Sequence, residues 1–327
     1  MAFRLPLDGY QHLAHERVQA VVKDVFRDGG LDGEYGQRLL HAFNRSLLPA
    51  SASSPIRNLP VLACQASGGD PHRALPVLAA WQVVCLALKL LDDVEDGDIS
   101  DDIAEHINTA TGLLVASPLL LQKVFQEDGF RLNERLTSEL QCAVLHACAG
   151  QHADLQVNQA GVNDIDPDAW LRIALAKSGA LFSWATWAGA LVAHADNRIL
   201  SCYREYGRHL GVLLQIADDL NDVWYPKASN DLHTGRLSLP VCYALTVTRG
   251  EARERLEALR QRARSGDIAA EDDLRRVLTE LGALHYLAVA ARVQYHQALQ
   301  ALEQAGDRSQ ADHLVALLDD LLLPLTV

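Results

Sequence analysis

The sequence predicts an all-α fold, and three features of the chain support this prediction. Helix-period apolar patterns recur along the 327 residues, and no run of alternating β-branched residues occurs. Hydrophobic residues make up 49% of the chain, enough for a large core without a disulfide or metal staple. The breaker clusters between the patterns are all too short for an interdomain linker. We therefore expect a single domain over residues 1–327, a large bundle of many helices around a central cavity.

The expected helices follow these patterns in order, and breaker residues set their ends. Clusters at 28–30, 51–55, 67–71, 163–167 and 225–231 combine Gly, Pro, Ser, Asn and Asp, which favour turns. In chain order, the expected helices are 11–27, 33–48, 72–95, 101–115, 132–158, 167–194, 197–225, 237–248, 251–263, 270–281, 284–305 and 309–322.

One stretch, 173–195, is long enough to cross a bilayer, and its only charged residue is Lys177. It also carries Ser178, Ser183 and Thr186, and a charged Lys within a membrane helix is costly. We therefore favour a buried central helix over a transmembrane span, and expect no stable membrane insertion.

Charge and cysteine content narrow the possible partners and the compartment. The chain has 29 basic and 42 acidic residues, a net charge of −13, which argues against nucleic acid as a partner. Its six cysteines are scattered without a CxxC pair, as expected for buried thiols in a reducing compartment. The N-terminus lacks the apolar core of a signal peptide, so we expect a cytoplasmic protein.

Two aspartate-rich runs, Asp92–Asp96 and Asp218–Asp222, follow apolar segments. Both have the spacing DDxxD, so the first and last Asp of each share one helix face. Like charges on one face repel, and their recurrence indicates a compensating cation. Oxygen ligands without His or Cys suit Mg²⁺, which binds through a few carboxylates and substrate phosphates. The alternative is a solvated acidic pair, the interpretation that we favour for Asp319 and Asp320.

The order of these and other motifs resembles that of the trans-isoprenyl diphosphate synthase family, also called polyprenyl synthetases. The further matching segments are Pro55-Ile56-Arg57-Asn58-Leu59-Pro60 (GGKRxRP in the family), Gly68-Gly69-Asp70-Pro71, Gly150-Gln151-His152-Ala153-Asp154-Leu155 (GQxxDL), Ala176-Lys177-Ser178 (Lys-Thr/Ser), Leu214-Gln215-Ile216-Ala217-Asp218-Asp219 (FQIxDD) and 227–240 (KxxxDLxxGKxTLP). Arg236 stands where the last motif usually has Lys. The resemblance covers most of the chain, and it implies a helical bundle of the isoprenoid synthase type with a central active-site cavity. It also implies an enzyme that acts on an allylic prenyl diphosphate and assembles as a homodimer.

The resemblance also implies roles for individual residues. Metal ligands would be Asp92, Asp96 and Asp218, supported by Asp93, Asp219 and Asp222, with three Mg²⁺ ions when diphosphate is bound. Diphosphate ligands would be Arg57, Lys177, Ser178, Lys227 and Arg236. Gln215 would line the reaction centre, and Asp154 would support the metal cluster. Without the family pattern, Lys177 would be interpreted as a snorkelling side chain, and Lys227 and Arg236 as ordinary loop charge.

The chain departs from the family pattern at the second substrate, isopentenyl diphosphate. The residues that hold it in chain-elongating members are replaced here by Ile56, Leu59, Cys85 and Asp102. The family's Arg-Arg pair after the first motif is replaced by Asp101 and Asp102. Each lost Arg–phosphate contact costs on the order of 1.5–3 kcal/mol. We therefore favour a terpene synthase or cyclase that ionises the allylic diphosphate and releases pyrophosphate without isopentenyl diphosphate.

Three other functions remain open. The chain could be a chain-elongating trans-prenyltransferase with an atypical acceptor site. It could be a regulatory subunit of a heteromeric prenyl synthase, because Asp101 replaces an Arg that normally helps to hold the allylic diphosphate. It could also transfer the prenyl group to an uncharged acceptor.

The helix before the first motif gives an expectation for substrate length. Trp81, Val84 and Leu88 lie on about the same helix face as Asp92, a face on which the family sets chain length. Ala87 and Leu88 leave more room than paired aromatic residues would, and Trp81 could form the pocket floor. We expect a substrate of fifteen or twenty carbons. The alternative is that Trp81 is an ordinary core residue.

Overall fold

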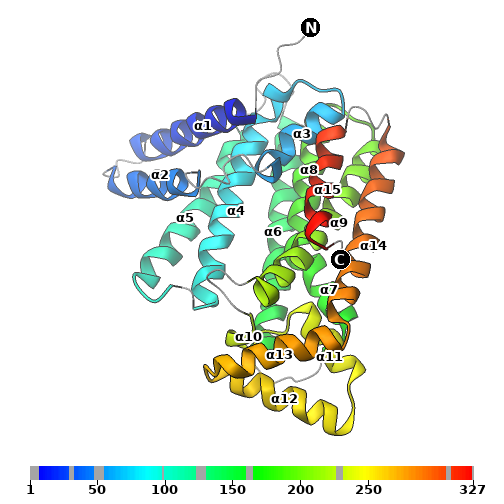
Figure 1. The fold of residues 1–327 in the computed structure, drawn as a ribbon. Coiled ribbons are helices and arrows are strands. Elements are labelled where there is room, and N and C mark those ends of the chain that lie inside the picture. The colour runs from blue at the N-terminus through cyan, green and yellow to red at the C-terminus, as the bar shows by residue number, and fades with distance from the viewer. Residues whose placement is uncertain are drawn as a thin grey trace. The chain divides into compact units, whose positions relative to one another are not determined.

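The fold is built from helices throughout the part of the chain that the computed structural model describes (Figure 1). The described residues are 7–28, 33–47, 55–97, 99–122, 130–159, 165–225, 231–306 and 311–325. The predicted fold class is therefore confirmed. Lys227 and the predicted helix ends at residues 48 and 309 lie outside the described residues.

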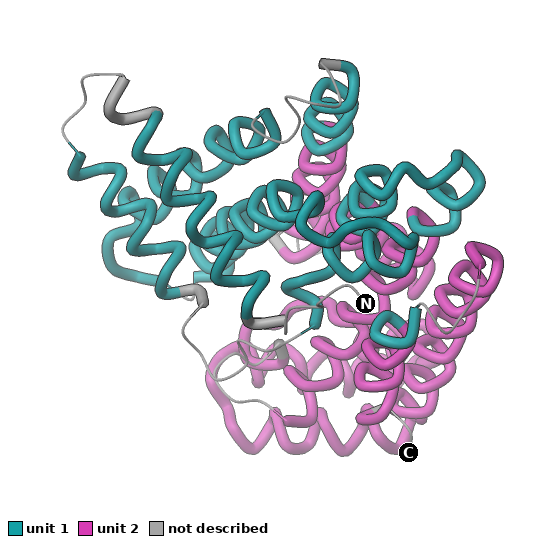
Figure 2. The backbone as a smooth tube through the Cα atoms, turned by 90° about the horizontal axis from the view of Figure 1, so that it is seen from above, with its two compact units in different colours: residues 1–141, 184–203, 307–314 teal, residues 142–183, 204–306, 315–327 magenta. Residues whose placement is uncertain are grey.

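The chain divides into two compact units (Figure 2). Unit 1 contains residues 1–141, 184–203 and 307–314. Unit 2 contains residues 142–183, 204–306 and 315–327. The single domain over residues 1–327 stays a prediction.

Unit 1 is organised around α4, whose N-terminal two thirds are almost entirely buried. Helices α1, α3 and α5 pack against α4. Its elements are α1 (Leu7–Asp28), α2 (Glu34–Leu47), η1 (Pro55–Asn58), α3 (Leu59–Ala66), η2 (Pro71–Ala74), α4 (Leu75–Glu95) and α5 (Ile103–Gln122), with parts of α6 (Phe130–Gln159), α8 (Ala180–Val192), α9 (Asn197–Trp224) and α15 (Asp312–Leu322).

Unit 2 contains the rest of the long helices α6 and α9 together with the C-terminal helices. Helix α11 packs against α7, α13 and α14, and α12 packs against α13. The further elements are α7 (Pro167–Ala174), the π-helical turn η3 (Leu175–Gly179), α10 (Asp231–Thr234), α11 (Leu239–Val247), α12 (Gly250–Arg264), α13 (Ile268–Glu280), α14 (Ala283–Ala305) and η5 (Leu323–Leu325).

Helix α5 is longer than predicted because it continues through Pro118. A proline within a helix has no N–H for the carbonyl four residues earlier, here that of Leu114. The Ser117 hydroxyl donates to this carbonyl at 2.9 Å and replaces the missing hydrogen bond. The prediction of a helix end at residue 115 was wrong for this reason.

The predicted helix 167–194 is interrupted by the π turn η3 and ends at Val192. Most of its second half is buried, including Trp184 and Trp187. The single described helical stretch that is long and apolar enough to cross a membrane is a different one, Pro71–Glu95. Its most apolar window is 67% buried among other residues, as is typical of a core helix.

Candidate active site

The first aspartate motif lies at the C-terminal end of α4 in unit 1. Asp92, Asp93 and Asp96 are half-buried, and the Asp96 backbone N–H donates to the Asp92 carbonyl at 2.8 Å. Asp93 forms an ion pair with Lys89, one helical turn earlier, at 2.5 Å. The Asp92 and Asp96 side chains share a helix face, as predicted. Asp93 is therefore partly neutralised by a lysine of its own helix.

Helix α4 also fixes the backbone of η1, which carries Arg57. The Trp81 indole N–H donates to the Ile56 carbonyl at 3.4 Å, and the Gln82 amide donates to the Arg57 carbonyl at the same distance. Arg57 is half-buried and close enough to Cys85 for its charge to act on that thiol. Burial is the larger effect, and it raises the pKa of Cys85, which keeps the thiol neutral.

The positions that depart from the family pattern have structural explanations in unit 1. Leu59 is fully buried at the start of α3, where an arginine would be a costly buried charge. Asp102 is exposed and has a φ of 56°, in the left-handed region that Asp tolerates better than most residues. Its carbonyl accepts hydrogen bonds from the N–H groups of Glu105 and His106 at the start of α5.

The predicted pocket floor belongs to the buried side of α4. Trp81 is 2% exposed, Val84 and Ala87 are fully buried, and Leu88 is half-buried. This burial agrees equally with a pocket wall and with ordinary core packing. Their effect on substrate length stays a prediction.

The second aspartate motif lies on α9 in unit 2. Ile216, Leu220 and Val223 are buried, whereas Asp218 is exposed and Asp222 is half-buried. Asp219 is half-buried, and its Oδ2 atom accepts a hydrogen bond from the Leu239 N–H at 2.5 Å. This bond ties α9 to the first residue of α11. One Asp219 oxygen therefore has a structural partner, and the predicted metal role of Asp219 stays untested.

Lys177 lies in the π turn η3 and is held by α6. Its ammonium group donates to Asp154 Oδ2 at 3.3 Å, and the Lys177 side chain is 20% exposed. Gly150, on α6, allows this close approach, because a Cβ there would lie 2.8 Å from the Lys177 Cα. Single π turns within helices often occur at functional sites. Ser178 in the same turn and Gln215 on α9 are half-buried.

A hydrogen-bonded chain extends from Lys177 to the segment that carries Arg236. Asn158 Nδ2 donates to Asp154 Oδ1 at 3.1 Å, and Asn158 Oδ1 accepts from the Leu237 N–H at 3.0 Å. Arg236 is half-buried and immediately precedes Leu237. The sequence analysis missed Asn158. The signal was its position four residues after Asp154, on the same face of α6.

The residues fit Mg²⁺ by the chemistry of their donors. Each motif offers carboxylate oxygens at i and i+4, and Mg²⁺ typically takes one or two protein carboxylates and fills its other positions with water and phosphate. Within the described ranges, no group of three or more His, Cys, Asp or Glu side chains could hold a metal by itself.

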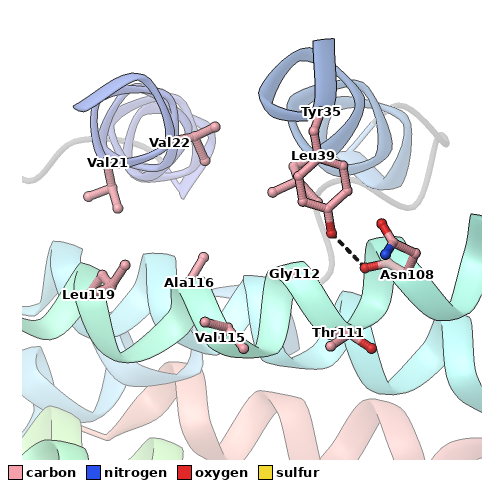
Figure 3. Close-up of a pocket in the computed structure, with 10 residues that line it drawn as sticks. All are labelled: Val21, Val22, Tyr35, Leu39, Asn108, Thr111, Gly112, Val115, Ala116 and Leu119. Carbon is pink, nitrogen blue, oxygen red and sulfur yellow. Dashed lines mark hydrogen bonds between the residues drawn. The ribbon is translucent and has the colours of Figure 1, made fainter. Parts of the chain in front are cut away.

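An apolar cavity of about 240 Å³ lies in unit 1 between α1, α2 and α5 (Figure 3). The Tyr35 hydroxyl at its edge donates to the Asn108 carbonyl at 2.6 Å. The lining residues are Val21, Val22, Tyr35, Leu39, Asn108, Thr111, Gly112, Val115, Ala116 and Leu119. None of the predicted site residues is among them, so this cavity is separate from the candidate active site.

Residues 55–280 match the family described as polyprenyl synthetase, a range that contains both aspartate motifs and every predicted site residue. The chain belongs to the polyprenyl synthetase family. A geranylgeranyl diphosphate synthase of Mycobacterium tuberculosis is 33% identical over 67% of this chain, and the match spans 65% of that protein. A short chain isoprenyl diphosphate synthase of Methanothermobacter thermautotrophicus is 25% identical over 96% of both chains. The expectation of a prenyltransferase-type enzyme is therefore confirmed at the level of the family.

Solved structures of polyprenyl synthetases have the same fold. The polyprenyl synthetase of Streptomyces coelicolor A3(2) has a TM-score of 0.79 and 26% identity, covering 96% of this chain and 98% of the other. The geranylgeranyl pyrophosphate synthetase of Pyrococcus horikoshii has a TM-score of 0.80 at 18% identity, with 95% of each chain covered. The family match and the named relatives, which are prenyl diphosphate synthases, favour chain elongation and do not support the predicted terpene synthase over it.

Proposed function

We propose that the chain is a trans-prenyltransferase that elongates an allylic diphosphate of fifteen or twenty carbons, with an atypical site for the acceptor. The family match over residues 55–280 carries this proposal. The relatives are named for products of different lengths, among them geranylgeranyl and octaprenyl diphosphate. The names of the relatives therefore do not fix the length of the prenyl product of this protein. We expect the pocket-floor residues of α4 to determine it.

In the proposed mechanism, each motif supplies carboxylates that would bind the Mg²⁺ required by the leaving diphosphate. Asp92 and Asp96 from α4, and Asp218 and Asp222 from α9, would hold up to three Mg²⁺ ions. Bound Mg²⁺ would neutralise charge that develops on the departing pyrophosphate. Lys177 and Arg236 donate to diphosphate oxygens, and Arg57, Ser178 and Lys227 are further candidates. Such donors act best when they are fixed before the substrate binds.

The acceptor side is what makes the proposed enzyme atypical. Leu59 is a core residue and Cys85 is a neutral thiol, so neither offers a positive charge to a second diphosphate. Asn58 is fully buried, and neither of its amide atoms is hydrogen-bonded within the described residues. The same holds for Oε1 of Gln82, whose residue is 7% exposed. Buried amides without partners are rare, and they are chemically suited to a water or an uncharged polar group.

The lack of positive charge at Leu59 and Cys85 favours a second candidate function, in which no second diphosphate is used. The allylic cation would then cyclise, lose a proton, capture water, or pass to an uncharged acceptor. A regulatory subunit without activity of its own is a further alternative. Its defining property would be that the purified chain releases no pyrophosphate.

The test is incubation of the purified protein with Mg²⁺ and farnesyl or geranylgeranyl diphosphate, with and without isopentenyl diphosphate. Pyrophosphate release and product mass are the two measurements. Longer prenyl diphosphates formed only with isopentenyl diphosphate would support elongation. Terpene hydrocarbons or alcohols formed without it would replace the proposal with the second candidate. Absence of pyrophosphate release under all conditions would favour the regulatory subunit.

Two further expectations belong to the same proposal. A homodimer is expected, and sedimentation velocity of the purified protein would measure it. A cytoplasmic location is expected from the scattered cysteines. The expectation that they are buried is wrong for Cys142 and Cys148, which are exposed on α6. Fractionation of cells that express the protein would test the location.

A further inference from the structure

Asn158 lies on α6 in unit 2, and its side-chain amide makes two hydrogen bonds to different parts of that unit. Nδ2 donates to Asp154 Oδ1 at 3.1 Å, and Oδ1 accepts from the Leu237 backbone N–H at 3.0 Å. A carboxylate can only accept and a backbone N–H can only donate, so these two bonds require one orientation of the amide. The side chain therefore bridges the Asp154 carboxylate and the Leu237 backbone N–H.

Each end of this bridge leads to a proposed diphosphate ligand. The other Asp154 oxygen, Oδ2, accepts from the Lys177 ammonium group at 3.3 Å. Leu237 directly follows Arg236 in the chain. The segment after Arg236 is fixed a second time where Leu239 N–H donates to Asp219 Oδ2. Leu237, Ser238 and Leu239 are all buried, which anchors the backbone beside Arg236.

We propose that Asn158 is a positioning residue that sets Lys177 and Arg236 relative to each other for diphosphate binding. This proposal rests on the proposed function, because it takes these two residues as the diphosphate ligands. Lysine and arginine side chains lose considerable rotamer entropy when they are fixed. Asn158 lowers the cost of ordering by holding the Asp154 carboxylate toward Lys177 and the backbone next to Arg236. Donors fixed in this way stabilise developing charge without reorganisation during the reaction.

The first test variant is Asn158→Ala, which removes both hydrogen bonds. We expect it to weaken the binding of Mg²⁺-pyrophosphate, measured by titration calorimetry, by about tenfold or more, since each lost bond to a charged or buried group contributes. With an allylic substrate, kcat should fall by a similar factor. A purely architectural role would instead lower the fraction of folded protein and leave the affinity of the folded fraction unchanged.

The second variant, Asn158→Asp, gives a pH signature. The new carboxyl would accept from Leu237 N–H as before, but it would repel Asp154 when both are ionised. The repulsion raises the pKa of whichever carboxyl of the pair ionises second above the ordinary value of about 4, and the ammonium group of Lys177, 3.3 Å from Asp154, opposes this rise in part. Below that raised pKa, one shared proton restores the donor to Asp154. The affinity of the Asp variant, relative to the parent, should therefore recover as pH falls from 8 to 5.5, while that of the Ala variant should not.

Asn133→Asp is the matched control, because Asn133 lies on the same helix and its amide also donates, to the Gln122 carbonyl at 3.3 Å. This residue has no connection to Lys177 or Arg236 in the hydrogen-bonded chain described above. Its relative affinity for Mg²⁺-pyrophosphate should stay constant with pH. The proposal is overturned if Asn158→Asp follows the control, or if Asn158→Ala binds within twofold of the parent. Failure of the proposed function would look different: Mg²⁺-pyrophosphate would bind and show the Asn158 effects, but no allylic diphosphate would be turned over.

Discussion

At the scale of single residues, Asp218 and Asp219 are neighbours on α9 with different surroundings. Asp218 is exposed, whereas Asp219 accepts a hydrogen bond from the first residue of α11. Asp219→Ala should lower the free energy of unfolding by about 1–2 kcal/mol, because it leaves a buried N–H without its acceptor. Asp219→Asn keeps an acceptor oxygen and should lower it less. Urea denaturation measures both.

Asp218→Asn is the comparison variant at the adjacent position. Its stability should stay within about 0.5 kcal/mol of the parent, as for most exposed sites. Its Mg²⁺-dependent pyrophosphate release should fall on the order of 10²-fold, because the proposed site would lose one of its metal-binding carboxylates. An unchanged rate would show that Asp218 is not part of the catalytic centre.

At this scale, the sequence predicted the residue types of the candidate site better than it predicted their hydrogen-bond partners. The DDxxD spacing placed Asp92 with Asp96 on one face, because helical periodicity alone determines that. It did not reveal that Asp219 is tied to Leu239, or that Asp154 is bound to both Lys177 and Asn158, since these contacts join distant segments. The same limit applies to Leu59: its departure from the family pattern was visible, but its burial at the start of α3 was not.

At the scale of elements, Gly150 allows α6 to approach the π turn that carries Lys177. Gly150→Ala would place a Cβ 2.8 Å from the Lys177 Cα, a backbone atom that cannot rotate away. We expect a loss of about 1–3 kcal/mol in the free energy of unfolding despite the higher helix propensity of Ala. Gly150→Ala should also weaken the binding of Mg²⁺-pyrophosphate, because η3, which carries Lys177, must shift.

Gly112→Ala is the matched variant, in the interior of α5. A Cβ there would meet the Tyr35 ring, with Cζ at 2.9 Å, but this side chain lies beside the 240 Å³ cavity and has room to move (Figure 3). Its loss of stability should be smaller than that of Gly150→Ala, and Mg²⁺-pyrophosphate binding should not change. Equal losses in the two variants would contradict the importance of backbone contact at Gly150.

The start of α13 gives a pH-dependent prediction. Asp267 is the N-cap, accepting from Ala270 N–H at 3.1 Å, and Arg262 donates to it at 2.7 and 3.0 Å. The Arg262 hydrogen bonds and, next, that from Ala270 lower the pKa of Asp267. A lowered pKa in the folded state adds stability above the ordinary value of about 4, and this stability is lost as pH falls through the folded pKa.

Asp267→Asn keeps the capping oxygen and removes the charge. Thermal melts should show a lower Tm than the parent at pH 7, with the difference shrinking as the pH falls below about 4 and through the lowered pKa of Asp267. In an Arg262→Gln background the difference at pH 7 should be smaller, because the main cause of the pKa shift is gone. A difference that is independent of pH would contradict this assignment.

The existence and order of the long helices were predictable, because apolar periodicity and breaker clusters are local signals. Elements that depend on context were not. Helix α5 continues past Pro118 because Ser117 supplies the missing hydrogen bond, and η3 forms where α6 comes close at Gly150. The short helix α3 was missed because its eight residues, Leu59–Ala66, are too few for a periodic pattern to stand out.

At the scale of the whole molecule, similarity along the chain identifies the family, whereas departures at single positions bear on which substrates the protein uses. The match over residues 55–280 shows the family, and this range contains both aspartate motifs. Four positions depart from the family pattern: Ile56 in η1, Leu59 at the start of α3, Cys85 on α4 and Asp102 before α5. All four lie within unit 1. The Lys177–Asp154–Asn158 contacts lie within unit 2. The departures therefore lie in the unit that also carries the first aspartate motif, and Lys177 lies in the other unit.

Whether both aspartate motifs act on one diphosphate is a prediction about the molecule as a whole. Mg²⁺-pyrophosphate that binds only the folded state raises Tm by an amount set by its concentration relative to Kd. Asp92→Asn and Asp218→Asn should each reduce this rise. If one diphosphate uses both motifs, the double variant should lose less binding free energy than the two single variants added together. Additive losses would mean that the motifs bind separate ligands, and the proposed centre would then be wrong. Titration calorimetry of the four proteins decides between these outcomes, and Asp319→Asn, at the acidic pair that we interpret as solvated, should leave the binding unchanged.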